Sequence, residues 1–472
     1  MDTFGFGADE LMRLAGAAAW RVLLDRWPEA RRIGIACGPG NNGGDGYVLA
    51  LNARASGREV VVVTLPDGTP RSDPARALHA EWLAYGAVQA FDGELAEVDL
   101  WVDAVFGIGL TRASEGQAAA LIDALNASGK PMFALDLPSG IEADKGHALG
   151  TAIRADCTLQ FIVAKRGMYT GVARTLAGTL LLDALGFSPT QLASEQHDAE
   201  LLRADALATW LPRRARGAHK GDFGHVLCVG GDHGTGGAVV LCAQAALRCG
   251  AGLVSVATRA PQVAALLAAR PEVMAHAVEE SADFAPLVQR ASVVAIGPGL
   301  GQGDWGRALY AAALASRKSL VIDADALNLL AQHPQPLHDA ILTPHPGEAA
   351  RLLDVSTDTI QRDRYAAAQQ LADRYGSTVV LKGAGSIVAS PGEIPAIIAA
   401  GNPGMATGGM GDVLTGVIAA LRAQGLSTFD AARCGALLHA MAGDAAARDG
   451  GERGLLPSDL FSQLRRLANP CA

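Results

Sequence analysis

The chain has 472 residues, of which 50% are hydrophobic and 18% charged, so it is long enough for two or three domains and too apolar for a disordered or fibrous protein. Its net charge of −9 and the lack of any lysine or arginine run argue against nucleic acid as a partner. The 56 glycines follow no fixed period, which excludes collagen and indicates loops with special backbone geometry.

The seven cysteines (37, 157, 228, 242, 249, 434 and 471) lie mostly in apolar runs without C-x-x-C spacing. We therefore predict reduced thiols, with neither a zinc site nor a disulfide framework. The start, MDTFGFGADELMRL, lacks the basic and apolar segments of a secretory signal. Arg248 and several glycines interrupt the most apolar stretch, residues 236–258, so we expect a cytoplasmic protein without membrane association.

Short runs rich in β-branched residues alternate with helical segments through the first part of the chain. We expect strands at residues 33–37, 60–64, 100–104, 132–135, 158–163 and 179–182. Strands separated by helices predict a parallel sheet covered on both faces, that is, an α/β fold with three layers. The pattern ends in a polar stretch and an arginine cluster near residues 211–217, which indicates a solvated linker or, alternatively, a contact for an anion. We place the two domains at residues 1–210 and 211–472.

The first expected strand runs into the glycine loop GPGNNGGDG, residues 38–46, which precedes a helix. Such a loop lets backbone N–H groups approach a phosphate at a helix N-terminus. Asn41, Asn42 and Asp45 sharpen this interpretation, although turn and capping roles are the alternative.

Two further acids, Asp103 and Asp136, fall at the carboxyl ends of expected strands. Ligands bind at that edge of open α/β sheets, so we predict a site there; the alternative is that each aspartate caps the next helix.

Four segments of this half together resemble the NAD(P)H-hydrate epimerase domain over about residues 8–190: NNGGDG (41–46), DAVFGIGL (103–110), LDLPSG (135–140) and ADCTLQF (155–161). The resemblance implies a Rossmann-like α/β/α domain whose substrate is a nicotinamide nucleotide hydrated at C6. It implies that two segments hold the phosphates and sugars: Asn41, Asn42, Gly43, Gly44, Asp45, and Gly107, Ile108, Gly109, Leu110, Thr111, Arg112, Ala113.

The same resemblance gives Asp136 contact with the hydrate as the acid/base group. It makes Asn42, Asp103 and Ser139 ligands of a potassium ion, consistent with oxygen donors for a hard cation. Lys165 matches a lysine of the pattern and would add a positive charge near the site, unless it is a surface lysine.

In the second domain we expect eight strands, followed by helical stretches at 408–423 and 429–448 with no strand between them. The expected strands are 225–229, 253–257, 292–296, 319–322, 340–343, 378–381, 386–389 and 394–398.

The strongest motif of this domain, GNPGMATGGMGD, ends at Asp412 and opens an apolar helix. Consecutive N–H groups at a helix N-terminus make an anion hole, and an aspartate beside it is placed to take a proton from a hydroxyl during phosphoryl transfer. The alternative is a first-turn aspartate that stabilises the helix dipole. The segment Lys382–Ser386 links two strands and would hold a nucleotide phosphate, unless it is a plain hairpin turn.

Six segments covering about residues 213–465 resemble the ribokinase-like ADP-dependent NAD(P)H-hydrate dehydratase: KGDFGHV (220–226), GPGLG (297–301), DADALNLL (323–330), LTPHPGEAARLL (342–353), LKGAGS (381–386) and GNPGMATGGMGDVLTG (401–416). The resemblance implies a ribokinase-like α/β/α domain. It assigns the hydrate to Ala238, Gly299, Gly301, His345 and Asp412, and the adenine nucleotide to Lys382, Gly383, Ala384, Gly385, Ser386 and Gly411.

Two residues of this set keep open alternatives. His345 could be a loop histidine that caps the following helix, and Asp323 is a weaker phosphate-side or metal-side candidate that could simply start a helix. A magnesium ion bridging the phosphates is expected from the chemistry rather than from a visible ligand cluster.

The two resemblances together predict a bifunctional repair enzyme. Its first domain would interconvert the R and S C6-hydrates of NADH and NADPH (NADHX and NADPHX), and its second would dehydrate the S form with ADP as phosphoryl donor, giving AMP and phosphate. We expect these small molecules as its partners, and a homo-oligomer. The alternatives are a vitamin or sugar kinase fused to a nucleotide-binding module, and a first domain that binds without catalysing.

Overall fold

The computed structural model describes residues 6–193 and 195–470, so Cys471 lies outside the described residues. The chain divides into two units, residues 1–197 and 198–472. The sequence placed residues 198–210 in the first domain. They belong to the second unit because a strand within them, at Glu200–Leu202, pairs with Ala396–Ile398 of the second sheet.

The first unit is built on a seven-stranded parallel sheet in the order β3-β2-β1-β4-β5-β6-β7. Its elements are β1 (Arg32–Cys37), β2 (Glu59–Thr64), β3 (Val88–Ala90), β4 (Leu100–Ala104), β5 (Met132–Leu135), β6 (Cys157–Phe161), β7 (Thr179–Asp183), α1 (Ala8–Arg26), α2 (Asn41–Ala55), α3 (Asp73–Leu83), α4 (Gly116–Ala127), α5 (Ala173–Leu176) and α6 (Pro189–Ala193). The six strands expected from the sequence are present; β3 was not expected.

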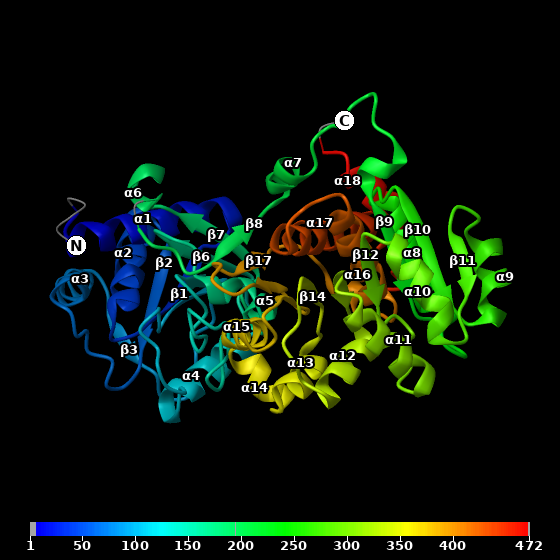
Figure 1. The fold of residues 1–472 in the computed structure, drawn as a ribbon. Coiled ribbons are helices and arrows are strands. Elements are labelled where there is room, and N and C mark those ends of the chain that lie inside the picture. The colour runs from blue at the N-terminus through cyan, green and yellow to red at the C-terminus, as the bar shows by residue number, and fades with distance from the viewer. Residues whose placement is uncertain (1–5, 194, 471–472) are drawn as a thin grey trace. The chain divides into compact units, whose positions relative to one another are not determined.

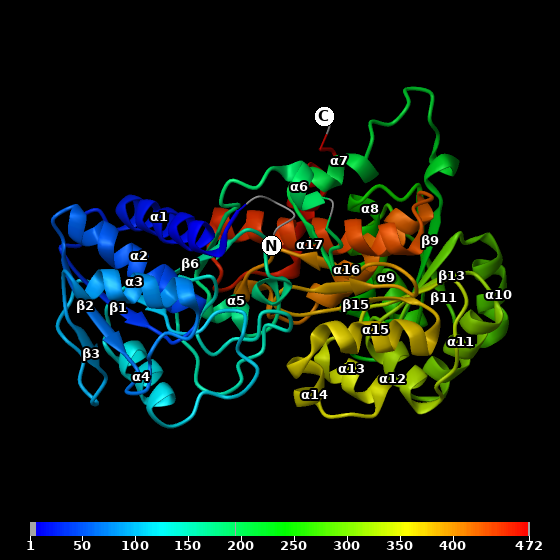
Figure 2. The ribbon, with the colours of Figure 1, turned by 90° about the vertical axis from the view of Figure 1, so that its left-hand side faces the viewer.

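Alternation along the strands divides the core of this unit into two layers. Ile33 and Ile35 of β1 pack in one hydrophobic cluster with α1, α2 and α3, while Ala36 packs in another with α4. Figure 2 shows α4 on the opposite side of this sheet from α1 and α2. Because side chains of a strand point alternately to the two faces, both faces are apolar and both are covered, which gives the three-layer arrangement.

The second unit contains a ten-stranded sheet in the order β11-β10-β9-β12-β13-β14-β15-β16-β17-β8. Its strands are β8 (Glu200–Leu202), β9 (His225–Val229), β10 (Leu253–Thr258), β11 (Met274–Ala277), β12 (Val293–Ile296), β13 (Ser319–Ile322), β14 (Ala340–Leu342), β15 (Thr378–Leu381), β16 (Ile387–Ala389) and β17 (Ala396–Ile398). The pairs β15–β16 and β16–β17 are antiparallel. All eight expected strands are present, and β8 and β11 are additional.

Helices cover both faces of this sheet (Figure 1). They are α7 (Leu207–Trp210), α8 (Gly236–Arg248), α9 (Ala260–Ala269), α10 (Ser281–Arg290), α11 (Asp304–Ala315), α12 (Ala324–Gln332), α13 (Pro346–Leu353), α14 (Thr357–Arg362), α15 (Arg364–Tyr375), α16 (Met410–Ala423), α17 (Thr428–Gly450) and α18 (Leu460–Leu467). One core cluster joins α8, α16, α17 and α18 to the strands, while α10, α11 and α15 contact strands from the other side. No helix among the described residues is long and apolar enough to cross a membrane.

Candidate active sites

In the first unit the strand order reverses between β1 and β4, and such a switch point opens a crevice at the carboxyl ends of the strands. The chain leaves β1 through Gly38 and enters α2 at Asn41. A Cβ at Gly38 would lie 1.8 Å from the carbonyl oxygen of Val105, and one at Gly43 would lie 2.0 Å from the carbonyl oxygen of Gly38. Only glycine lets this turn close, which brings the free N–H groups of the α2 N-terminus to the crevice.

Asn42 lies in the first turn of α2 and is 6% exposed, yet neither its amide oxygen nor its amide nitrogen has a hydrogen-bond partner among the described residues. An unsatisfied buried amide costs free energy, and this one would gain hydrogen bonds or coordination from a ligand bound beside it. Gly40 is the N-cap of α2 and makes no side-chain cap, so the asparagines do not have the capping role considered as an alternative.

Asp103 and Ser139 lie together beside this loop. The Ser139 hydroxyl donates to the Asp103 carboxylate at 2.6 Å, and the Ser139 N–H donates to its other oxygen at 2.7 Å. Burial raises the pKa of Asp103 to about 6, against the opposing effect of these hydrogen bonds. Asp103 therefore holds the turn after β5 rather than capping a helix.

Asp136 follows β5 and has a left-handed backbone with φ of 65°, a strained conformation for a residue with a side chain. Lys165 donates to its carboxylate and, at 2.7 Å, to the carbonyl of Phe161. The Lys165 side chain is 12% exposed, so it is not the surface lysine considered as an alternative. Desolvation raises the pKa of Asp45, the Asp136 charge raises it further, and Lys165 opposes both.

Only the first part of the expected binding loop, residues 107–113, lies close to this cluster. A Cβ at Gly107 would lie 3.4 Å from Cβ of Asn42 and 3.5 Å from a carboxylate oxygen of Asp136. Ile108 is 63% exposed, and Thr111, Arg112 and Ala113 are exposed too. The described contacts therefore bring together Asn42, Asp136 and Gly107, and leave the far end of the loop in solvent.

The second unit has its own switch point, between β9 and β12, and two glycine loops meet there. The N–H of Asp232 donates to the carbonyl of Gly299 at 2.7 Å, and the Thr235 hydroxyl donates to the same carbonyl at 2.9 Å. Gly299 and Gly301 have φ of 60° and 73°. Ala238 lies in the first turn of α8, directly after the first of these loops.

Asp323 follows β13 as the N-cap residue of α12, so it does start a helix, but its side chain makes no capping hydrogen bond and is buried at the centre of a polar cluster. Its carboxylate accepts hydrogen bonds from Lys382 Nζ at 2.8 Å and from the Thr415 hydroxyl at 2.9 Å. Glu348 lies 3.8 Å from Lys382 Nζ. Burial alone would lower the pKa of Lys382, but Asp323 and Glu348 outweigh it and raise that pKa. Lys382 is therefore a charged lysine held at the start of the hairpin between β15 and β16.

Asp412 lies in the first turn of α16, beside this cluster. Desolvation, reinforced by the charge of Asp323, raises the pKa of Asp412 to about 7, while Lys382 opposes the shift. A carboxylate whose main role is to complement a helix dipole would have a lowered pKa. The raised pKa suits a group that exchanges a proton near neutral pH, and Asp412 also stands in the first turn of α16, as the dipole alternative expected.

His345 is the N-cap of α13, and its Nδ1 accepts from the N–H groups of Gly347 and Glu348 at 3.0 and 3.4 Å. Its side chain is 51% exposed, with Nε2 3.5 Å from Glu348. Desolvation lowers the pKa of His345. The capping alternative is therefore realised, and about half of the side chain remains exposed.

Comparison with known proteins identifies both halves. Residues 226–466 match the model of the NAD(P)H-hydrate dehydratase family, and residues 8–167 match that of the YjeF-related protein N-terminus. The bifunctional NAD(P)H-hydrate repair enzyme of Coxiella burnetii is 46% identical over 99% of this chain and 96% of its own length; that of Escherichia coli is 45% identical over 99% and 91%.

This chain belongs to the bifunctional NAD(P)H-hydrate repair enzymes. Solved structures agree for the second unit of this repair enzyme. A ribokinase-like protein of Enterococcus faecalis is 31% identical, with a TM-score of 0.55, and the match covers 58% of this chain and 97% of that one. An ADP/ATP-dependent NAD(P)H-hydrate dehydratase of Bacillus subtilis, co-crystallised with ATP and Mg²⁺, is 26% identical, with a TM-score of 0.52 and coverage of 58% and 99%. These matches favour the repair enzyme over the vitamin or sugar kinase.

Three side chains of this repair enzyme take part in the polar clusters although the sequence did not single them out. Glu348 and Thr415 contact Lys382 and Asp323, and Asp444 of α17 accepts from the N–H of Gly401 and the amide of Asn402 at 3.0 and 2.9 Å. Glu348 stands three residues after His345 in a capping-box spacing, which could have revealed it. Asp444 lies within a regular helix, where nothing local marks it.

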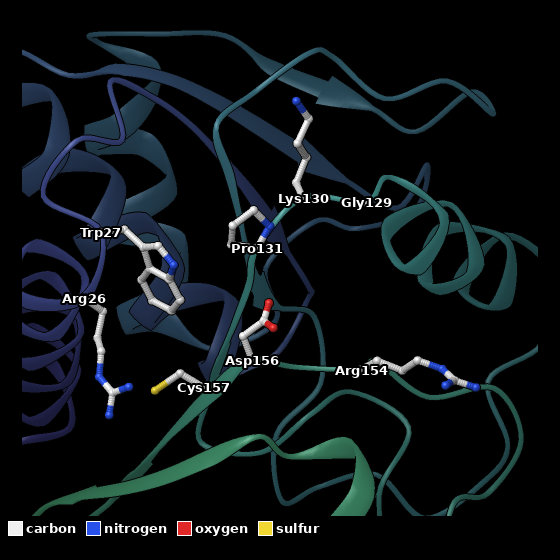
Figure 3. A pocket seen from close by; sticks show the side chains of 8 residues that line it. All are labelled: Arg26, Trp27, Gly129, Lys130, Pro131, Arg154, Asp156 and Cys157. Atoms are coloured by element: carbon white, nitrogen blue, oxygen red, sulfur yellow. The ribbon is translucent and has the colours of Figure 1, made fainter.

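In the first unit a cavity of about 610 Å³ lies at the amino ends of β5 and β6, whereas the cluster of that unit lies at the carboxyl ends of its strands (Figure 3). Trp27, Pro131 and the basic side chains of Arg26, Lys130 and Arg154 line it. Asp156 in its wall accepts from the N–H of Met132 at 2.8 Å, so it ties the two strand starts together. None of the acids of the first unit's cluster, Asp45, Asp103 and Asp136, lines this cavity, so we do not assign the repair chemistry to it.

Proposed function

We propose that the first unit of this repair enzyme interconverts the R and S hydrates of NADH and NADPH, and that the second dehydrates the S hydrate at the expense of ADP. One observation carries the proposal. Each unit has its own switch point, with a glycine loop, a helix N-terminus and an aspartate–lysine arrangement beside it. Two separate sites suit two successive reactions on one nucleotide.

In the second unit, Asp412 accepts the proton of the C6 hydroxyl as that oxygen attacks the terminal phosphoryl group of ADP, and AMP leaves. The ring nitrogen then supplies the electron pair that expels phosphate from C6, and loss of a C5 proton restores the dihydronicotinamide. A pKa of about 7 leaves Asp412 partly ionised at neutral pH and close to the ideal for a general base. The N–H groups at the start of α16 stabilise the phosphoryl group in transit.

The ligands of this reaction occupy two sides of Asp412. The hydrate contacts Ala238, Gly299, Gly301 and His345, and the nucleotide contacts Lys382, Gly383, Ala384, Gly385, Ser386 and Gly411. Gly411 supports this assignment, because a Cβ there would lie 3.2 Å from Lys382 Nζ. We propose that magnesium, when bound, neutralises phosphate charge. No group of three or more acidic, histidine or cysteine side chains that could hold a metal ion occurs among the described residues, so a magnesium ion would be held mainly by phosphate oxygens and water.

In the first unit, Asp136 acts as acid and base at the hydrated ring, with Lys165 holding its carboxylate in place. The N-terminus of α2, from Asn41 to Asp45, and the loop from Gly107 to Ala113 hold phosphates and sugars. Asn42, Asp103 and Ser139 offer an unpartnered amide oxygen, a carboxylate and a hydroxyl, and these oxygens fit a potassium ion. When bound there, potassium would supply positive charge to this site.

The experiment is an assay of the purified chain on a mixture of R and S hydrates. With ADP we expect NADH absorbance to return until both hydrates are consumed, because epimerisation feeds the S form to the dehydratase. A stable phosphorylated product instead of NADH would support the kinase alternative. Clearance of S alone, with no faster exchange from R to S, would make the first unit a binding module.

We also propose that the enzyme works in the cytoplasm as a homo-oligomer. The six cysteines within the described residues are free and buried, which fits a reducing compartment. Light scattering on the purified chain tests the oligomeric state.

A further inference from the structure

Arg364 is the largest fully buried charged side chain of the molecule's described part, only 1% exposed at the start of α15. Its Nη2 donates to the backbone carbonyls of Leu381 at 3.3 Å and Lys382 at 3.1 Å, and its Nη1 donates to the Gln361 side chain at 2.8 Å. Burying a guanidinium is costly, so a fold keeps one there only where its hydrogen bonds are needed. Two of these hydrogen bonds go to Leu381 and Lys382, where β15 ends and the hairpin loop Lys382–Ser386 begins.

The guanidinium lies directly beneath Gly383. A Cβ at that glycine would lie 2.9 Å from Nη2 and 3.0 Å from Nη1 of Arg364, and its φ of 141° is one that other residues rarely adopt. The absence of a side chain at Gly383 therefore allows the hairpin backbone to approach the guanidinium closely. Arg364 contacts the peptide backbone here through the carbonyls of Leu381 and Lys382.

Lys382 is fixed from other directions as well. Its N–H donates to the carbonyl of Pro344 at 2.9 Å, and its Nζ is held by Asp323. Arg364 adds hydrogen bonds to the carbonyl of Leu381, which belongs to the same peptide group as that N–H, and to the carbonyl of Lys382 itself. Burial lowers the pKa of Arg364 to about 10, so it stays protonated at neutral pH and adds a second positive charge below the loop.

We propose that Arg364 is a positioning residue for the nucleotide: it holds the Lys382–Gly383 peptide so that the N–H groups of the hairpin face the phosphates, and its charge supplements that of Lys382. The inference rests on the proposed role of this hairpin in binding ADP. It adds a residue that does not touch the ligand.

The test compares Arg364→Gln and Arg364→Lys with wild type in ADP binding by calorimetry and in steady-state dehydration. We expect Arg364→Gln to weaken ADP binding and raise its KM by about tenfold or more, with the KM for the hydrate changed less than twofold. Arg364→Lys keeps the charge but loses the geometry by which one guanidinium donates to several acceptors. Its KM for ADP should therefore lie between those of wild type and Arg364→Gln. Arg362→Gln, on the exposed helix just before, is the matched control and should match wild type.

A merely structural role would lower the unfolding temperature and the active fraction, and hence kcat, while KM for ADP stayed unchanged; that result overturns the proposal. If Arg364→Gln does not fold, Arg364→Lys decides by the same criterion. Wild-type binding is measured first: if wild type binds no ADP, the proposed function of the hairpin fails, independently of Arg364.

Discussion

At the scale of single residues, the proposed function assigns dehydration to Asp412 and epimerisation to Asp136. Each carboxylate has its own lysine nearby, Lys382 in one unit and Lys165 in the other, and no residue is shared. Asp412→Asn should abolish dehydration, by about a hundredfold or more, and spare epimerisation. Asp136→Asn should do the reverse, so that only the S hydrate is cleared. Chromatographic separation of the two hydrates measures both rates, and loss of both activities in either folded variant contradicts the two-site mechanism.

The raised pKa of Asp412 predicts how dehydration depends on pH. A general base must be ionised, so kcat/KM should fall about tenfold per pH unit below about 7 and level off above it. A rate–pH profile checks this, with epimerisation as the internal control. A profile that stays flat down to pH 5 or so would assign the proton to another group.

The same shift predicts a cost in stability. An aspartate ionises near pH 4 in the unfolded chain, whereas Asp412 stays protonated in the folded protein up to about 7, so its ionisation destabilises the fold as pH rises through that window. Asp412→Asn should therefore raise the unfolding temperature of the second unit at pH 8 and leave it nearly unchanged at pH 4. Calorimetry at both pH values measures the unfolding temperatures. An equal rise at pH 4 and pH 8 would mean that the variant changes packing and not the ionisation of residue 412.

Asn42 offers a test of the potassium site. Because its buried amide has no partner among the described residues, Asn42→Ala should cost little stability, less than about 1 kcal/mol, while it weakens epimerisation and its activation by potassium. The measurement is the epimerisation rate against potassium concentration, at constant ionic strength. A variant with unchanged potassium dependence would remove Asn42 from the ligand set.

At the scale of elements, the start of α2 depends on glycine at Gly43. Alanine there would place Cβ about 2.0 Å from the Gly38 carbonyl oxygen, which belongs to the backbone and cannot rotate away. Gly43→Ala should shift the helix start and reduce epimerisation at least tenfold, whereas Gly7→Ala, with nothing within 4 Å, should not. Dehydration is the control in both variants, and an unaffected epimerase in Gly43→Ala would show that the turn can relax.

Long buried strands could be predicted from the sequence, while short edge strands could not. Strand β1 is a run of apolar residues that ends in a glycine loop, and this signal is local. Strands β3, β8 and β11 have three or four residues of mixed character, such as Glu200–Leu202, and become strands only by pairing with a neighbour. For the same reason the domain boundary was predicted too late in the chain.

The candidate sites divide in the same way. Loops such as GPGNNGGDG and the segment before Asp412 can be predicted from the sequence, because the residues that form them are consecutive. The pairing of Lys382 with Asp323, and the support of Arg364, join residues from separate elements. Nothing in either local segment names the partner, so these contacts required the fold.

At the scale of the molecule, the contacts divide the chain between residues 197 and 198, whereas the change in composition placed the boundary at residue 211. A fragment of residues 198–472 keeps the edge strand β8 paired with β17, while one of 211–472 lacks β8 and leaves β17 as an unpaired edge. The longer fragment should be soluble and dehydrate the S hydrate, and the shorter should unfold at a lower temperature or aggregate. Circular dichroism melts of the two compare them, and equal melts would show that β8 contributes nothing.

The place of β8 also sets an order of events during synthesis. It leaves the ribosome first among the strands of its sheet, yet its partner, β17, is the last of them. At about 5–20 residues per second, this segment waits on the order of ten seconds or more for the rest of the sheet to be translated. Strand β8, at the start of the second unit, thus stays without its partner strand while the first unit has already been translated in full.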